Sequence, residues 1–120
     1  MRKILAASFV AGLIATTAAY ATQNSRDDLI AACRKEAETG YSLARKTEPS
    51  LRAMIDQHRQ RMSAACVAFA SGNLSTTAAL SQCLHETSAG PLHIQRDRAM
   101  DRKSVARQRD LCRALGAARP

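Results

Sequence analysis

The chain has 120 residues, a formal net charge of +8, four cysteines and no tryptophan, and aromatic residues make up only 3% of it. This length predicts a single domain. With so few large side chains, such a domain buries little apolar area, so we expect covalent cross-links to contribute to its stability. The scarcity of aromatic residues also argues against single-stranded nucleic-acid binding, which depends on base stacking.

Residues 1–21 have the pattern of a secretory signal peptide. Arg2 and Lys3 precede an apolar run from Ile4 to Ala15, and Ala19-Tyr20-Ala21 has the small-x-small form of a cleavage site. The alternative is an uncleaved membrane anchor, for which the apolar run is short. We therefore expect a mature domain over residues 22–120 with a charge of +6, no transmembrane segment after cleavage, and a periplasmic or secreted location.

The first predicted helix follows Ser25, which is a candidate N-cap with Asp27 and Asp28 in the first turn. Apolar residues then recur at helical spacing, namely Leu29, Ile30, Cys33, Ala37, Tyr41 and Ala44. Gly40 is expected to weaken this helix midway. Residues 47–50 predict the connection to the next helix.

Residues 51–84 predict two antiparallel helices joined by a turn at Gly72-Asn73. The apolar face of the first consists of Leu51, Met54, Ile55, His58, Met62, Ala65, Cys66 and Phe69. Ser75 or Thr76 can cap the second helix. Its apolar residues are Ala79, Leu80, Cys83 and Leu84. Residues 87–92 predict a loop after it.

The segment from Ile94 to Arg119 is the most basic part of the chain and carries +5 of the mature +6. Its basic residues are Arg96, Arg98, Arg102, Lys103, Arg107, Arg109, Arg113 and Arg119. The apolar residues Ile94, Met100, Val105, Leu111, Cys112 and Leu115 form a ragged face, so we expect this helix to pack less deeply than the others. Together the elements predict an all-α fold, a small three- to four-helix up-down bundle stapled by two disulfides.

Four cysteines in an exported chain predict two disulfides, with three possible pairings. Heights along an up-down bundle place Cys33, Cys66 and Cys83 near one end, and Cys112 joins them if the last helix begins near Asp97. Two pairings would therefore join cysteines at the same height along the bundle. One is Cys33–Cys66 with Cys83–Cys112, and the other is Cys66–Cys83 with Cys33–Cys112. We favour the second pairing, because Cys66–Cys83 lies within the local hairpin and Cys33–Cys112 would tie the first helix to the last.

No pattern of catalytic, metal-ligating or cofactor-binding residues is present. His58, His85 and His93 fall on separate elements, and neither C-x2-C nor H-x3-H spacing occurs. G-x-S-x-G and paired carboxylates are also missing, and pairing uses every cysteine. His58 lies on an apolar face, where we expect a hydrogen-bonded core histidine. An enzyme is a further hypothesis. It would need His58 to lie beside an acidic residue in a real cleft.

The basic C-terminal helix is the candidate contact surface for an anionic partner. The residues concerned are Arg96, Arg98, Arg102, Lys103, Arg107, Arg109 and Arg113. Suitable partners are lipid headgroups, a polyanionic cell-surface polymer or an acidic protein. The alternative is a solvated face whose charge is partly offset by Asp97 and Asp101. Nucleic acid is not expected, and the thin apolar face argues against a membrane-surface helix.

Residues 41–92 carry a further pattern. Tyr41 precedes a polar linker, then Leu51, Gln57, Arg61 and Cys66 follow, then a turn at Gly72, and then Cys83-Leu84 with Thr87 four residues after the cysteine. This pattern resembles the lysozyme-inhibitor LprI-like family of small exported bacterial proteins. The family's tryptophan before the cysteine of its second helix is missing here, and the basic extension after Leu92 is atypical.

The resemblance implies a helical periplasmic or secreted domain that binds a cell-wall hydrolase. Many lysozymes are strongly basic and would repel a protein of charge +6, so an acidic or neutral envelope partner fits better. We thus expect a non-catalytic envelope binding protein, with binding or inhibition of a cell-wall enzyme as its narrowest form. The alternative is a structural or stress-protective periplasmic protein that binds anionic surfaces nonspecifically through the basic helix.

Overall fold

The computed structural model describes residues 25–89 and 99–118. Their elements are α3 (Arg26–Thr39), α4 (Ser42–Thr47), the 3-10 turn η1 (Pro49–Leu51), α5 (Arg52–Val67), α6 (Thr76–Ser88) and α8 (Ala99–Ala117). The expected signal peptide, its cleavage site at Ala19 and Ala21, and the basic residues Arg96, Arg98 and Arg119 lie outside the described residues. None of the described helices is both long and apolar enough to cross a membrane.

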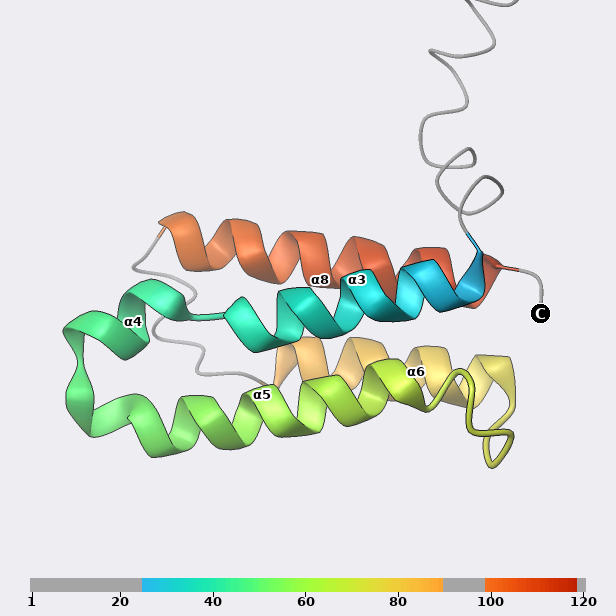
Figure 1. Cartoon of the computed structure of the whole chain (residues 1–120), viewed down its shortest axis with the longest axis horizontal. Coiled ribbons are helices and arrows are strands. Elements are labelled where there is room, and N and C mark those ends of the chain that lie inside the picture. The colour runs from blue at the N-terminus through green and yellow to red at the C-terminus, as the bar shows by residue number, and fades with distance from the viewer. Residues whose placement is uncertain (1–24, 90–98, 119–120) are drawn as a thin grey trace, which may run out of the picture.

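Four long helices run up and down, each antiparallel to the next (Figure 1). α3 packs against both α5 and α8, and α6 packs against the same two helices from the other side. The helices therefore occupy the corners of a square, and α4 lies at one end. The predicted all-α up-down bundle with two disulfides is confirmed, and the described residues include no strand.

The first predicted helix is broken at Gly40. The Ser25 cap forms as expected, because the Asp28 amide donates to Ser25 Oγ at 3.1 Å. Gly40 has extended backbone (ψ 142°) and ends α3, whereas a mid-helix weakening was predicted. Tyr41 then adopts the left-handed region (φ 59°) before α4 begins. The change of direction points Tyr41 into the core, so both Tyr41 and Ala44 are buried, as their apolar pattern predicted.

The predicted central hairpin is present, with small changes at its ends. Ser75 is the cap of α6, and its Oγ accepts from the Ala78 amide at 3.1 Å. Gly72 lies in the turn with φ +74°, a conformation that favours glycine. α6 extends to Ser88, so the start of the predicted loop over residues 87–92 is helical instead. Residues 90–92 of that loop lie outside the described part.

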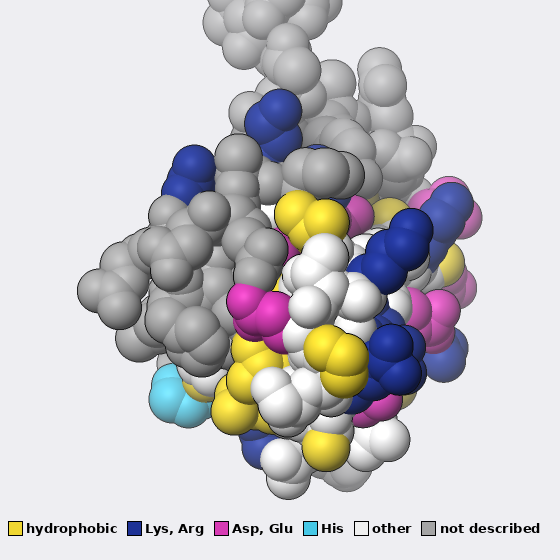
Figure 2. Space-filling view, turned by 90° about the vertical axis from the view of Figure 1, so that its left-hand side faces the viewer, with side chains coloured by type: hydrophobic (Ala, Val, Ile, Leu, Met, Phe, Trp, Pro, Cys, Tyr) yellow, Lys and Arg dark blue, Asp and Glu magenta, His cyan; other side chains and the backbone are white. Residues whose placement is uncertain are grey.

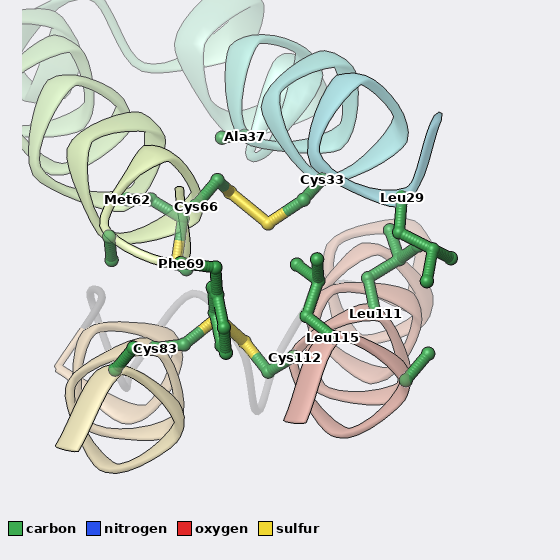
Figure 3. Close-up of a cluster of buried hydrophobic side chains, with 13 residues drawn as sticks. Leu29, Cys33, Ala37, Met62, Cys66, Phe69, Cys83, Leu111, Cys112 and Leu115 are labelled. Carbon is green, nitrogen blue, oxygen red and sulfur yellow. A yellow bond between two sulfur atoms is a disulfide. The ribbon is translucent and has the colours of Figure 1, made fainter. Parts of the chain in front are cut away.

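The core consists mainly of aliphatic side chains and the sulfur of the disulfides, with Phe69 as the aromatic residue of its larger cluster (Figure 3). Its larger cluster contains Leu29, Cys33, Ala37, Met62, Ala65, Cys66, Phe69, Ala79, Cys83, Leu111, Cys112, Ala114 and Leu115. A smaller cluster near α4 joins Tyr41, Ala44, Ile55 and Val105. All four cysteines are completely buried, so both disulfides are part of the packed interior.

The disulfides join Cys33 to Cys66 and Cys83 to Cys112, with Cα–Cα distances of 5.8 and 5.7 Å. The predicted pairs Cys33–Cys112 and Cys66–Cys83 are therefore wrong. At the corners of a square each cysteine is level with two neighbours, and height alone cannot choose between them. The bridges cross the α3–α5 and α6–α8 sides, where the Cα atoms are within disulfide reach (Figure 3). Cys66 and Cys83, the pair favoured because it lies within the local hairpin, are therefore not bonded to each other.

Candidate functional site

The outer face of α8 carries the described part of the predicted contact surface. Arg102, Lys103, Arg107 and Arg113 are exposed, and Arg109 is half-buried. At about 100° per residue, Arg102, Arg109 and Arg113 fall within about 40° of one another, so they form a row along the helix. The row is about 16 Å long at 1.5 Å rise per residue. We call Arg102, Lys103, Arg109 and Arg113 the α8 basic face.

The opposite side of α8 packs deeply, so the prediction that this helix packs less deeply than the others is wrong. Its buried residues are Asp101, Val105, Gln108, Leu111, Cys112, Ala114 and Leu115. Gly116 adds a close approach to α6, because a Cβ at this position would lie 2.8 Å from Leu80 Cδ2. The apolar pattern looked ragged because polar and small residues fill several inward positions. The basic side chains therefore project from a firmly held helix.

Gln108 attaches α8 to the disulfide of the opposite helix pair. Its Nε2 donates to the Cys33 carbonyl at 3.3 Å and lies 3.1 Å from Cys33 Sγ and 3.8 Å from Cys66 Sγ. On α6, Thr87 Oγ1 donates to the Cys83 carbonyl at 2.8 Å and is 3.6 Å from Cys112 Sγ. These buried polar contacts fix the position of α8 against its neighbours.

The charges around the α8 basic face are unevenly distributed. Arg107 lies on the α3 side, where its Nε donates to Glu36 Oε1 at 3.0 Å, and Ser104 Oγ donates to the same oxygen at 2.9 Å. Arg113 has a loose contact with Asp110 at 4.0 Å. On the other side, the exposed residues of α6 are uncharged or histidine, namely Thr76, Thr77, Ser81, Gln82, His85 and Ser88. Arg107 thus serves helix packing, while α6 adds no exposed acid beside the row.

His58 is buried, with 6% of its surface exposed, and it meets the Tyr41 ring edge-on at a centroid distance of 5.4 Å. Burial lowers the pKa of His58, an effect that the nearby Glu86 partly opposes. Burial therefore favours the neutral form of the imidazole in the folded protein. Its burial was predicted from the helix face, but the predicted hydrogen bond is missing at Nδ1, which has no partner among the described residues.

A cavity of about 20 Å³ adjoins His58 and is lined by Glu36, Tyr41, Met62, Ser104 and Gln108 among others. It has room for about one water molecule. Substrate pockets are larger by roughly an order of magnitude. Within residues 25–89 and 99–118, no group of three His, Cys, Asp or Glu side chains is placed to hold a metal ion.

An arginine cluster at the α4 end was not predicted. Arg45 forms a two-pronged pair with Asp56, with Nε–Oδ1 at 2.8 Å and Nη2–Oδ2 at 3.2 Å, and this hydrogen bonding lowers the pKa of Asp56. Arg59 Nε donates to the Gly40 carbonyl at 2.8 Å, and Arg52 Nε donates to the Arg45 carbonyl at 3.1 Å. Figure 2 shows basic and acidic side chains intermixed on one side of this end, beside an apolar patch. These contacts hold α4 against α5. The cluster also contains an acidic residue, Asp56, which offsets part of its positive charge.

We compared the chain with known families, curated proteins and solved structures. None of the family models, curated proteins or solved structures matches it. The resemblance to the lysozyme-inhibitor LprI-like family therefore stays a prediction.

Proposed function

We propose that this protein is an exported, non-catalytic binding protein of the cell envelope, which contacts an anionic partner through the α8 basic face. The observation that carries the proposal is the contrast between the two sides of α8. Its inner side is buried and cross-linked to α6 through Cys112, whereas its outer side presents cations along a rigid helix. Fixed charges of one sign steer and orient a partner of the opposite sign.

Export is supported by the two disulfides and by the signal-like pattern of residues 1–21. Disulfides persist in oxidising compartments such as the periplasm and the extracellular space. A non-catalytic role is supported by His58, which packs against Tyr41 beside a cavity of one-water size. The open cleft that an enzyme based on His58 would require is missing at this place.

Affinity capture from a native envelope extract tests the proposal. The oxidised protein is compared with Lys103→Glu/Arg113→Glu, which reverses two exposed charges of the α8 basic face. The matched control is Arg34→Glu/Lys35→Glu, because both residues are exposed on α3. We expect the α8 variant to lose the captured partner and the α3 variant to keep it. An α8 variant that retains every partner would count against this surface.

In its narrowest form the partner is a cell-wall enzyme that the protein inhibits, as the family resemblance implies. The net charge favours an acidic or neutral enzyme over a basic lysozyme. The second candidate is a structural or stress-protective protein that binds anionic surfaces without specificity. It is favoured by the lack of large apolar side chains among the exposed residues within 101–117 of α8. It predicts steep salt dependence and no saturable protein partner.

A further inference from the structure

We infer that the partner of the α8 basic face is an extended polyanionic chain, a linear polymer that carries phosphate or carboxylate groups. This inference rests on the proposed function, because it takes the α8 basic face as the contact surface. It adds the chemical class and shape of the partner, and it selects a polymer over a folded acidic protein or a lipid surface.

The composition of the surface argues against a folded protein partner. Among residues 101–117 of α8, the exposed ones are Arg102, Lys103, Ala106, Arg107, Asp110, Arg113 and Ala117. Large exposed apolar side chains in the described part are Met54, Val67 and Leu74, all on α5 or the turn that follows it. Stable protein interfaces have a buried centre built around aromatic, aliphatic or arginine anchors that fill pockets. The arginines of α8 have no apolar surroundings of that kind.

The same composition argues against insertion into a membrane and against base stacking. A helix that lies in a lipid surface buries an apolar face, whereas the larger apolar residues of α8 within residues 101–117, namely Val105, Leu111 and Leu115, are already buried in the bundle. The aromatic residues of the described part, Tyr41 and Phe69, are 2% and 8% exposed. They cannot stack on nucleic-acid bases.

The arrangement of charge suits a chain that lies along α8. The row from Arg102 to Arg113 follows the helix axis for about 16 Å, so an extended polymer would meet a cation every one to two turns. Guanidinium groups bind phosphate and carboxylate in two-pronged geometry. This geometry favours binding of a phosphate or carboxylate group over binding of a single-atom anion. Alongside the row, the exposed residues of α6 include no acidic side chain that would repel the polymer.

The experiment measures binding of two linear probes, inorganic polyphosphate and polygalacturonate, to the oxidised protein at several salt concentrations. The test variant is Arg102→Gln/Arg113→Gln, which removes two cations of the row, and the matched control is Arg34→Gln/Lys35→Gln. Each removes two basic side chains from exposed positions, and each includes an arginine that directly follows a disulfide cysteine. Circular dichroism checks that both variants fold.

We expect saturable binding of at least one probe, about tenfold weaker in the α8 variant and changed less than about twofold in the control, with affinity that falls steeply with salt. Polyphosphate alone binding would assign phosphate as the recognised group, and polygalacturonate alone would assign carboxylate; either result supports the inference. A capture experiment that yields an α8-dependent envelope protein, with neither polymer bound, would overturn the inference and leave the proposed function intact.

Two further results would also overturn it. Equal weakening in both variants would mean that net charge, and not the α8 basic face, controls binding, and the proposed function would fail with the inference. Tighter binding of anionic vesicles than of either polymer, at matched charge concentration, would reject the linear polymer as the partner.

Discussion

At the scale of single residues, the ionisation of His58 is tied to folding. The imidazole is enclosed by α5, Tyr41 and the neighbouring helices, and Glu86 and Arg61 are the charged groups that act on it. Removal from water disfavours the imidazolium, so the pKa of His58 is below its ordinary value of 6.5 in the folded chain. The unfolded chain, in contrast, has an ordinary histidine at this position.

This difference makes the stability dependent on pH. As the pH falls below about 6.5, the unfolded chain takes up a proton that folded His58 refuses. The free energy of unfolding should therefore keep its maximum value above that pH. It should decline as the pH falls further, and the decline should end once the pH passes below the lowered pKa of folded His58. We expect urea unfolding between about pH 7.5 and 5.5 to show this decline.

The variant His58→Gln should lose much of this pH dependence, whereas His85→Gln, at an exposed position, should keep it. Unchanged pH dependence in His58→Gln would show that another group is responsible. If that variant folds poorly, an NMR titration of the native imidazole gives the same answer. A His58 signal that titrates at or above 6.5 would contradict the prediction.

Gly116 is the second residue with a specific consequence. A Cβ here would lie 2.8 Å from Leu80 Cδ2 and 3.2 Å from Leu80 Cδ1, so Gly116→Ala should destabilise the protein by about 1 kcal/mol through overpacking. In a Leu80→Ala background the same substitution should be neutral, or stabilising by about 0.5 kcal/mol through helix propensity. Urea unfolding of the four proteins measures this coupling, and equal effects in both backgrounds would refute the close contact.

Single residues differed in how well the sequence predicted them. Ser25 was recognised as a cap, and Ser75 was one of two candidate caps with Thr76, because capping depends on a few neighbouring residues only. The roles of Gln108 and Glu36 could not be recognised. Their partners, Cys33 and Arg107, lie on other helices, and no local pattern reports such a contact.

At the scale of elements, the helices were predicted well and their packing was not. Periodicity located α3, α5, α6 and α8 because each has an apolar face. It missed the break after Gly40, since the stripe from Leu29 to Ala44 continues across it. Periodicity also underestimated how deeply α8 is buried. The inward face of this helix contains Asp101 and Gln108, and polar residues argue against burial when their partners are unknown.

The two disulfides should contribute almost equally to stability. They span 33 and 29 residues, and in the chain-entropy model each closed loop of this length is worth about 3.5 kcal/mol. The variants Cys33→Ala/Cys66→Ala and Cys83→Ala/Cys112→Ala should therefore lose similar amounts in chemical unfolding at low temperature. The pairing favoured from sequence would have closed one short and one long loop, with unequal losses. A difference of more than about 1 kcal/mol between the two variants would contradict this prediction.

At the scale of the whole molecule, the chain consists of two disulfide-closed halves. The first contains α3, α4 and α5, and the second contains α6 and α8 (Figure 1). The turn around Gly72 is the polypeptide connection between them, and residues 71–77 are exposed. Non-covalent packing of α3 on α8 and of α5 on α6 completes the bundle.

A protease site inserted between Gly72 and Asn73 tests this organisation. After cleavage, a denaturing gel without reductant should show two separate fragments, because neither disulfide crosses the turn. On a native gel the fragments should remain together, held by the shared core. The uncut protein is the control. A single cleaved species that needs reductant to separate would mean that the sulfur atoms are paired across the halves.

The square arrangement explains why sequence reasoning reached the fold but not the connectivity. Heights along the bundle are properties of one chain segment at a time and follow from 1.5 Å per residue. The choice between two adjacent sides of a square depends on how each helix is rotated about its axis. That rotation is set by the packing of the complete core, including Gln108 against Cys33 and Gly116 against Leu80.

The order of the cysteines has a consequence for oxidation of the chain after the proposed export. Each bridge joins a cysteine to the next one along the chain, first Cys33 with Cys66 and then Cys83 with Cys112. A chain that crosses a membrane amino end first exposes its thiols in that same sequence. A simple oxidase that couples thiols as they emerge would yield the native linkages directly, without an isomerase to rearrange them.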